Sequence, residues 1–86
     1  MKNKTNLPKW FNGKTYEKGD TVTNPFSGET YELNNLELSM YDFIMGIQLV
    51  MELHSNSRTN ENINNFHKAL SWFRTHNATA YMVLLD

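Results

Sequence analysis

The spacing of hydrophobic residues changes once along this chain, near residue 35. Between Trp10 and Leu33, short runs such as DTVT and ETYEL alternate polar and apolar residues, as half-buried strands do. Asn-Gly, Lys-Gly-Asp and Asn-Pro-Phe-Ser-Gly separate these runs with turn signals. From Leu36 onward, apolar residues recur every three or four positions, which is typical of helices. The pattern predicts an N-terminal β-hairpin or small meander followed by helices.

The segment TVTNPFSGETYEL predicts the turn of that hairpin. Pro25 fixes its own φ and disfavours the helical region for Asn24, while Gly28 can adopt the positive φ that closes a turn. Val22 and Tyr31 would then be near neighbours on one face of the two strands. A two-stranded hairpin is only marginally stable alone, so we expect it to pack against the helices.

A first helix is predicted over about residues 35–55. Asn34 and Glu37 have the spacing of a capping box at its start, although Ser39 and Asp42 repeat the pattern and leave a start one turn later open. At about 100° per residue, one broad apolar stripe of this helix faces the core. Its members are Leu36, Met40, Phe43, Ile44, Ile47, Val50 and Met51.

The same helix carries a second apolar stripe, on nearly the opposite side from the first. It consists of Leu38, Tyr41, Met45 and Leu49. A helix with two apolar faces is either the central helix of a small domain or uses the second face to contact another chain. Each of these residues is thus a candidate for the core as well as for an interface. We predict that this stripe, with Trp72 as an additional anchor, binds a protein partner or a second copy in a homodimer.

Two further helices are predicted after the polar segment HSNSRTNEN. Thr59 is a candidate N-cap for a helix over about residues 60–76. The stripe that packs this helix against the first one is Ile63, Phe66, Leu70 and Phe73. Asn77 suits the cap of a short terminal helix, which we favour, although AYMVLL also suits a strand added to the hairpin. The elements together predict an α+β fold, with a hairpin or meander packed on a helical hairpin and a short C-terminal helix.

The chain has 86 residues, of which 40% are hydrophobic, enough for one small domain with a core. We expect a flexible basic arm over residues 1–9, which lack periodicity, and a single domain over residues 10–86. The N-terminus has no apolar signal segment, and four polar residues interrupt the most apolar region of the chain. We therefore predict a cytoplasmic protein that does not contact a membrane.

Candidate chemistry is sparse. The absence of cysteine excludes disulfides, thiol nucleophiles and thiolate zinc sites. The three histidines lack a zinc-binding spacing, and the glycines do not form a phosphate-binding loop. Ser27 lies in no nucleophile motif, and we expect Glu29, Glu32 and Glu37 to be solvated charges instead of an acid–base pair. The sequence predicts no catalytic, cofactor or metal site, no small-molecule substrate and no enzymatic activity.

Charge is distributed unevenly, and this suggests an alternative function. The net charge is −1, but residues 1–18 contain five lysines and one glutamate. Lys9, Trp10, Lys14 and Lys18 combine cations with an aromatic ring, which suits the phosphates and unpaired bases of a single-stranded nucleic acid. Against this alternative, the rest of the chain is acidic and Trp10 also suits the core. We therefore expect nucleic-acid binding less than protein binding.

A family resemblance rests on two segments, NPFSGETYELNNLELSMYDFIMG and WFRTHNATAYMVLLD. Over roughly residues 16–86 they resemble a group of small uncharacterised proteins encoded by tailed phages of marine bacteria. The group has no agreed activity, so the resemblance transfers no site residue. It implies a phage-encoded accessory protein made in the infected cell. The function predicted from the sequence is a non-enzymatic interaction module that self-associates or docks on a host or phage protein.

Overall fold

The computed structural model describes residues 7–11 and 13–85 of the chain. Its elements follow in the order β1 (Asp20–Thr23), β2 (Thr30–Leu33), α1 (Asn35–Leu53), the 3-10 helix η2 (Ser55–Ser57), α2 (Asn60–His76) and α3 (Ala78–Leu84). The predicted α+β fold is confirmed. Residues 78–84 form the short terminal helix that we favoured over a strand.

The two strands form one antiparallel pair in which Val22 lies opposite Tyr31, as predicted. The turn between them is built by the Asn24 side chain, whose Oδ1 accepts a hydrogen bond of 2.8 Å from the backbone N–H of Phe26. Gly28 closes the turn with a φ of 81°, a conformation that glycine adopts at no steric cost. NPFSG is therefore the turn of a hairpin, as the sequence predicts.

The helices begin at the predicted caps. Asn34 and Glu37 form a capping box, in which each side chain accepts a hydrogen bond from the backbone N–H of the other residue at 2.8 and 3.0 Å. Thr59 caps α2, and the Oδ1 of Asn77 accepts from the Ala80 N–H at the start of α3. In addition, the Asn77 Nδ2 donates to the second carboxylate oxygen of Glu37 at 2.9 Å. One buried carboxylate thus joins the first turns of α1 and α3.

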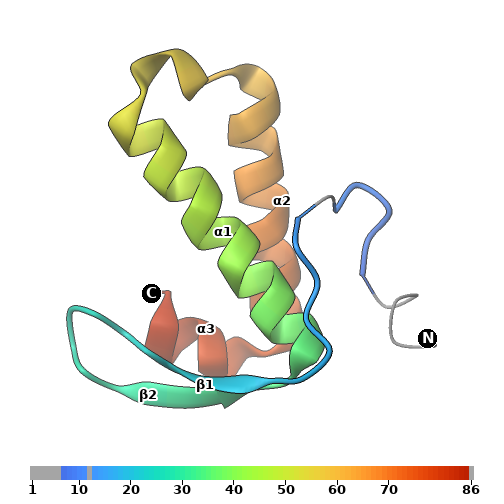
Figure 1. Cartoon of the computed structure of the whole chain (residues 1–86), viewed down its shortest axis with the longest axis vertical. Coiled ribbons are helices and arrows are strands. Elements are labelled where there is room, and N and C mark those ends of the chain that lie inside the picture. Colours follow the sequence, from blue (N-terminus) through green and yellow to red (C-terminus); the bar gives the residue numbers. More distant parts are fainter. Residues whose placement is uncertain (1–6, 12, 86) are drawn as a thin grey trace.

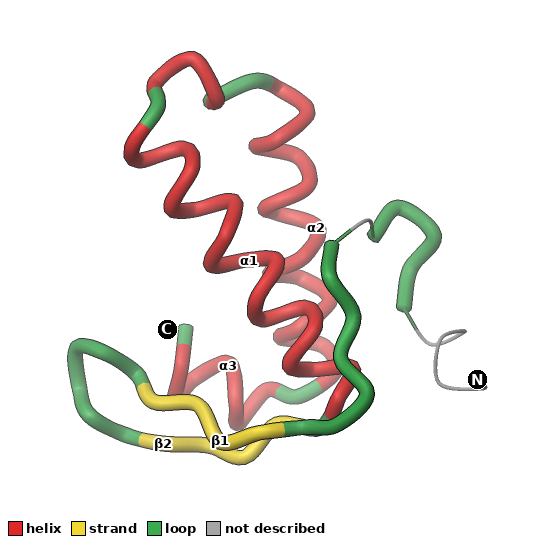
Figure 2. Tube along the Cα trace, in the orientation of Figure 1, coloured by secondary structure: helices red, strands yellow, loops and turns green. Residues whose placement is uncertain are grey.

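α1 and α2 lie side by side as a helical hairpin, and the remaining elements gather at one end of it (Figure 1). The β-hairpin and α3 lie where α1 begins and α2 ends, and the segment before β1 runs past the same end (Figure 2). The Asn24 Nδ2 donates to the Val83 carbonyl at 2.9 Å and ties the β-turn to α3. The other end of the helical hairpin extends beyond these layers.

The core follows this arrangement. Among the described residues, the buried apolar side chains are Leu33, Leu36, Met40, Ile44, Ala69, Phe73, Ala80 and Leu84. Those on α1 lie at or before Ile44, and those on α2 lie at or after Ala69. We call residues 35–44 and 69–76 the proximal half of the helical hairpin, and residues 45–68 the distal half. The proximal half contains the buried apolar residues of both helices.

Some predicted positions differ from the structure. Val50 belongs to the predicted core stripe but is exposed, because no third layer formed by the described residues covers α1 in the distal half. Of the predicted arm, residues 1–6 lie outside the described residues, while Leu7 is partly buried and packs against the core. None of the helices in the described part of the chain is long and apolar enough to cross a membrane.

Candidate protein-docking surface

The distal half is rich in apolar side chains, yet none of its residues is buried. Residues 45–68 are all described, and their large apolar side chains are Met45, Ile47, Leu49, Val50, Met51, Leu53, Ile63 and Phe66. Of these, only Phe66 packs against the core cluster. Leu49 is 55% exposed and Leu53 is 67% exposed. Two helices alone bury only the line along which they touch, so the outer apolar positions stay in water.

Four residues of the distal half form one outward surface of α1. Gly46, Leu49, Val50 and Leu53 follow the i, i+3, i+4, i+7 spacing that places residues on one face of a helix. We call this surface the Gly46 face. All four residues are exposed. An exposed apolar face with helical spacing is the form that a helix presents to another helix.

Gly46 is unusual because it lies in the interior of a helix and no described residue packs against it. Among residues 7–11 and 13–85, a Cβ atom added at Gly46 would meet nothing within 4 Å. Glycine in a helix interior costs about 0.5–1 kcal/mol relative to alanine. The fold of this chain therefore gains nothing from the absence of a side chain at this position. A bare helix backbone does, however, permit another chain to approach closely.

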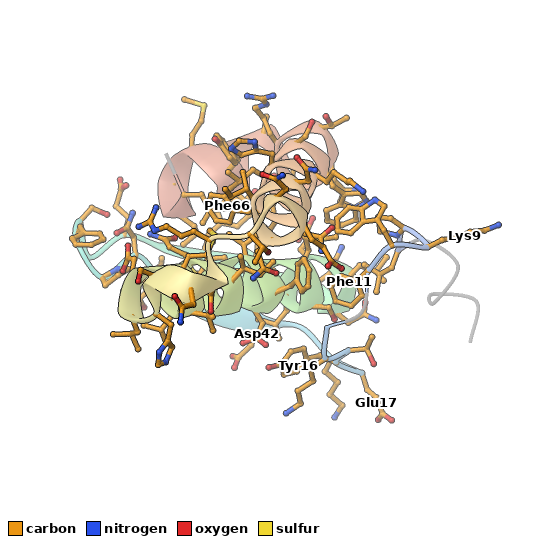
Figure 3. The ribbon with its side chains drawn as sticks, turned by 90° about the horizontal axis from the view of Figure 1, so that it is seen from above. Lys9, Phe11, Tyr16, Glu17, Asp42 and Phe66 are labelled. Carbon is orange, nitrogen blue, oxygen red and sulfur yellow. The ribbon has the colours of Figure 1, made fainter. Side chains whose placement is uncertain are left out.

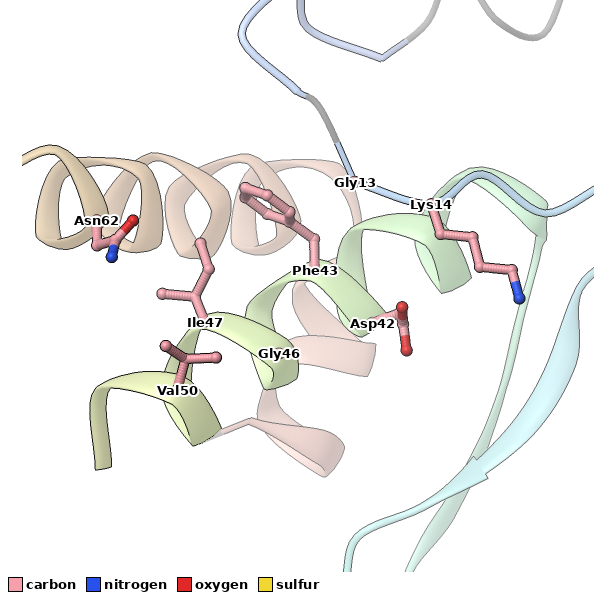
Figure 4. A pocket seen from close by; sticks show the side chains of 8 residues that line it. All are labelled: Gly13, Lys14, Asp42, Phe43, Gly46, Ile47, Val50 and Asn62. Atoms are coloured by element: carbon pink, nitrogen blue, oxygen red, sulfur yellow. The ribbon is translucent and has the colours of Figure 1, made fainter. Parts of the chain in front are cut away.

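An open groove of about 340 Å³ lies beside the Gly46 face. Its apolar wall comes from α1, and Asn62 of α2 and the segment at Gly13 border it (Figure 4). Polar groups mark one end, where Asp42 and Lys14 are found. The complete lining is Gly13, Lys14, Asp42, Phe43, Gly46, Ile47, Val50 and Asn62.

The N-terminal segment closes the proximal end of this groove. Trp10 and Phe11 pack on Phe43, with ring centroids 6.1 and 5.1 Å apart. Farther along, the Tyr16 backbone N–H donates to the Ser39 Oγ at 3.0 Å and holds the segment against α1. Residues 7–11 and 13–16 cover the proximal part of α1 in this way, and the contacts that they make lie before Gly46.

The structure divides the five residues that the sequence predicts for partner binding. Leu38 and Tyr41 are partly buried and pack against the core cluster, Tyr41 with its ring 6.4 Å from that of Phe73. Burial also raises the pKa of the Tyr41 hydroxyl above its ordinary value. Met45 is partly buried in the distal half, and Leu49 is exposed on the Gly46 face. Gly46 and Leu53 were not predicted, although their spacing with Leu49 is visible in the sequence.

Trp72, the fifth of these residues, lies on α2 in the proximal half and is not part of the Gly46 face. Its ring packs against the core cluster and lies 6.5 Å from the ring of Phe73. Its indole also stacks on His76, with ring centroids 4.4 Å apart and planes 9° from parallel. An open hollow of about 450 Å³ is bordered there by Ser71, Trp72, Thr75 and His76. The hollow provides an aromatic platform but no buried polar group that would select a ligand.

The four residues of the nucleic-acid alternative do not form one surface for bases. Trp10 packs on Phe43, and the Lys68 Nζ lies over its ring at 5.6 Å from the centroid. The Lys14 Nζ lies over the Tyr16 ring at 5.1 Å, whereas the Lys9 side chain extends away from the body (Figure 3). Lys18 is exposed. The aromatic ring that would stack on a base is therefore already engaged within the chain.

The carboxylates considered for chemistry have different environments. Glu29 and Glu32 are exposed, as expected of solvated charges. Glu37 is not solvated, contrary to the prediction: it is buried, and the hydrogen bonds that it accepts from the Asn34 N–H and the Asn77 side chain replace its lost hydration. The Ser27 Oγ accepts from the Glu29 N–H within the turn. Within residues 7–11 and 13–85, no three histidine, aspartate or glutamate side chains form a group that could hold a metal ion.

Comparisons with known proteins leave the family open. No family model, no curated protein and no solved structure matches this chain. The resemblance to small phage-encoded proteins therefore remains a prediction from the sequence.

Proposed function

We propose that this protein is a non-enzymatic interaction module that binds another protein chain through the distal half of its helical hairpin. One observation carries the proposal: residues 45–68 contain a concentration of large apolar side chains, and none is buried. A contiguous exposed apolar surface on a small domain is typical of a contact with another protein. Three further features support the same conclusion: the open space at Gly46, the groove beside it, and the exposure of Leu49 and Leu53.

The charges around this surface also suit a protein partner. The distal half contains the exposed residues Glu52, Arg58, Glu61 and Lys68, and Asp42 lies just before it on α1, so both signs of charge are present. Mixed polar rims around an apolar centre are common at protein interfaces. A surface for nucleic acid would instead be expected to carry a mainly basic face. In the described part of the N-terminal segment, the Trp10 ring packs on Phe43 instead of being free to stack on a base.

The resemblance to phage proteins suggests where this protein would act. If the chain is an accessory protein of a tailed phage, it works in the cytoplasm of the infected bacterium. Its partners would then be a second copy of itself, another phage protein or a host protein.

The test compares the wild-type chain with the double variant Leu49→Glu/Leu53→Glu. Tagged protein is used to capture partners from a lysate of the host, with nuclease added, and self-association is measured on the same samples. We expect the variant to keep its helical circular-dichroism spectrum and to lose both self-association and specific capture. Met82→Glu is the matched control, because Met82 is 65% exposed on α3 and lies outside the distal half.

A folded double variant that captures the same proteins and self-associates as well as the wild type would refute the proposed function. Binding that disappears on nuclease treatment and is unaffected by the double variant would instead indicate a nucleic-acid ligand.

A further inference from the structure

We infer that the chain covering the Gly46 face is a second copy of this protein, packed with its α1 antiparallel to the first. This inference rests on the proposed function and names the partner. It follows from the order of small and large residues along the face and from the charges at its two ends.

The Gly46 face is complementary to itself under a twofold rotation. If the axis passes between Leu49 and Val50, each of these residues lies opposite the other residue in the second copy. The same register places Leu53 of one chain opposite Gly46 of the other. The most exposed large side chain of the face, at 67%, then sits over the one position without a side chain. Such a fit of a protruding residue into a gap is the way in which paired helices pack.

The charges on α1 favour the antiparallel direction. Aspartate and glutamate are the only charged residues of this helix, at Glu37, Asp42 and Glu52. A parallel pair would place Asp42 opposite Asp42 and Glu52 opposite Glu52, and like charges at such positions repel. In the antiparallel register, Asp42 approaches the end of the second copy that carries His54 and Arg58. Lys14 lies near Asp42 in the groove, but its Nζ lies over the Tyr16 ring of its own chain.

The surroundings of the face leave room for this contact. The described part of the N-terminal segment is held on α1 at Ser39 and packs on Phe43, so these contacts lie on the proximal side of the Gly46 face. Above that point, α1 and α2 extend beyond the β-hairpin and α3 (Figure 1). A twofold contact centred between Leu49 and Val50 therefore joins the two distal halves and leaves the proximal halves apart.

The contact is small, so the dimer is expected to be weak. Three side chains and the bare backbone at Gly46 from each copy correspond to an interface at the low end of the usual size range. A dissociation constant on the order of 10–100 μM is reasonable for such a contact. Sedimentation velocity on the full chain from about 5 μM to 1 mM would follow the expected change from monomer to dimer. The sizes of the two species differ by a factor of two and are easily separated.

Variants on the face test the register. Leu53→Glu should raise the dissociation constant at least about tenfold, because it places a carboxylate over the partner backbone. Gly46→Gln should have a similar effect, although its side chain enters open space in the single chain. Met82→Glu, at comparable exposure on α3, should leave the dissociation constant within about threefold of the wild type.

Cysteine cross-linking tests the direction, and the chain contains no cysteine that would interfere. Gly46→Cys and Leu53→Cys are made separately, mixed in equal amounts and oxidised mildly. The antiparallel register predicts mainly the mixed disulfide between the two variants, because residues 46 and 53 of different copies lie opposite each other. A parallel register predicts mainly the two symmetric disulfides. Intact-mass measurement distinguishes these products.

The results separate this inference from the proposed function. A wild-type chain that stays monomeric to 1 mM and forms no mixed disulfide overturns the second-copy inference. If that monomer still captures a host or phage protein through Leu49 and Leu53, the proposed function stands with a different partner. A dimer that Leu53→Glu and Gly46→Gln do not weaken also overturns the inference, because it would use another surface.

Discussion

The proximal and distal halves of the helical hairpin are built from the same two helices but differ in what covers them. In the proximal half, the β-hairpin, α3 and the N-terminal segment surround α1 and α2, and Met40, Ile44 and Phe73 are completely buried. In the distal half, none of the described residues is buried, and Leu49, Val50 and Leu53 remain exposed. The comparison shows that an apolar pattern becomes a core only where a further layer closes over it.

The largest expected difference between the halves comes from two isoleucines on α1. Ile44 is completely buried, whereas Ile47, one turn later, is partly exposed and does not pack against the core cluster. Ile44→Ala should lower the free energy of unfolding by about 2–5 kcal/mol, since it leaves a cavity among fixed neighbours. Ile47→Ala should cost about 1 kcal/mol or less. Urea denaturation at a concentration well below dimer formation measures both changes.

Equal losses at Ile44 and Ile47 would contradict the division into halves, because they would require a core that extends into residues 45–68.

The next effect concerns Glu37, the buried carboxylate of the proximal half. Glu37→Ala removes the hydrogen bonds to the Asn34 N–H and the Asn77 side chain, so we expect a loss of about 2–3 kcal/mol in the free energy of unfolding. Glu37→Gln keeps one carbonyl oxygen and should lose less. Glu52→Ala is the matched control in the distal half, where Glu52 is exposed and its change should stay within about 0.5 kcal/mol. Chemical denaturation of the three variants measures these losses, which should be largest for Glu37→Ala and smallest for Glu52→Ala. A Glu37→Ala variant as stable as Glu52→Ala would contradict the conclusion that the Glu37 carboxylate stabilises the first turns of α1 and α3.

A smaller effect of opposite sign is expected at Gly46 in the distal half. Gly46→Ala should raise the free energy of unfolding of the single chain by about 0.5–1 kcal/mol, because alanine fits the open space and favours the helix. The measurement is thermal or urea unfolding at low micromolar concentration, where the dimer is absent. A destabilised Gly46→Ala monomer would mean that a neighbouring group of the same chain occupies the space beside this residue.

The smallest effect is a pH dependence that belongs to the proximal half. Burial raises the pKa of Tyr41 in the folded chain, so above about pH 10 the unfolded chain loses this proton more readily than the folded one. The contribution of Tyr41 is therefore fully present below that pH and is lost as the pH rises through the folded pKa. Tyr41→Phe should weaken the decline in unfolding free energy as the pH rises above about 10. An unchanged pH profile in this variant would exclude Tyr41 as its source.

Much of the local structure follows from the sequence because short-range rules decide it. The Asn34–Glu37 spacing places the start of α1, Thr59 and Asn77 place the starts of α2 and α3, and Asn24-Pro25 with Gly28 places the turn of the hairpin. Each of these devices satisfies backbone groups or a φ preference within a few residues. For that reason the sequence by itself determined the starts of the helices to within about one turn and the pairing of Val22 with Tyr31. It did not predict the 3-10 helix Ser55–Ser57, and it left a strand open as the alternative for the residues of α3.

The tertiary structure alone decided which apolar positions of α1 are covered. The periodicity places Ile44 and Val50 on the same stripe, yet one is buried and the other is exposed. The difference depends on contacts between distant residues, such as Asn24 with Val83, 59 positions apart, and Glu37 with Asn77, 40 positions apart. These contacts bring the β-hairpin and α3 to one end of the helices and leave the Gly46 face uncovered. A helical period records which side of a helix is apolar, but it carries no information on how far along that side the next layer reaches.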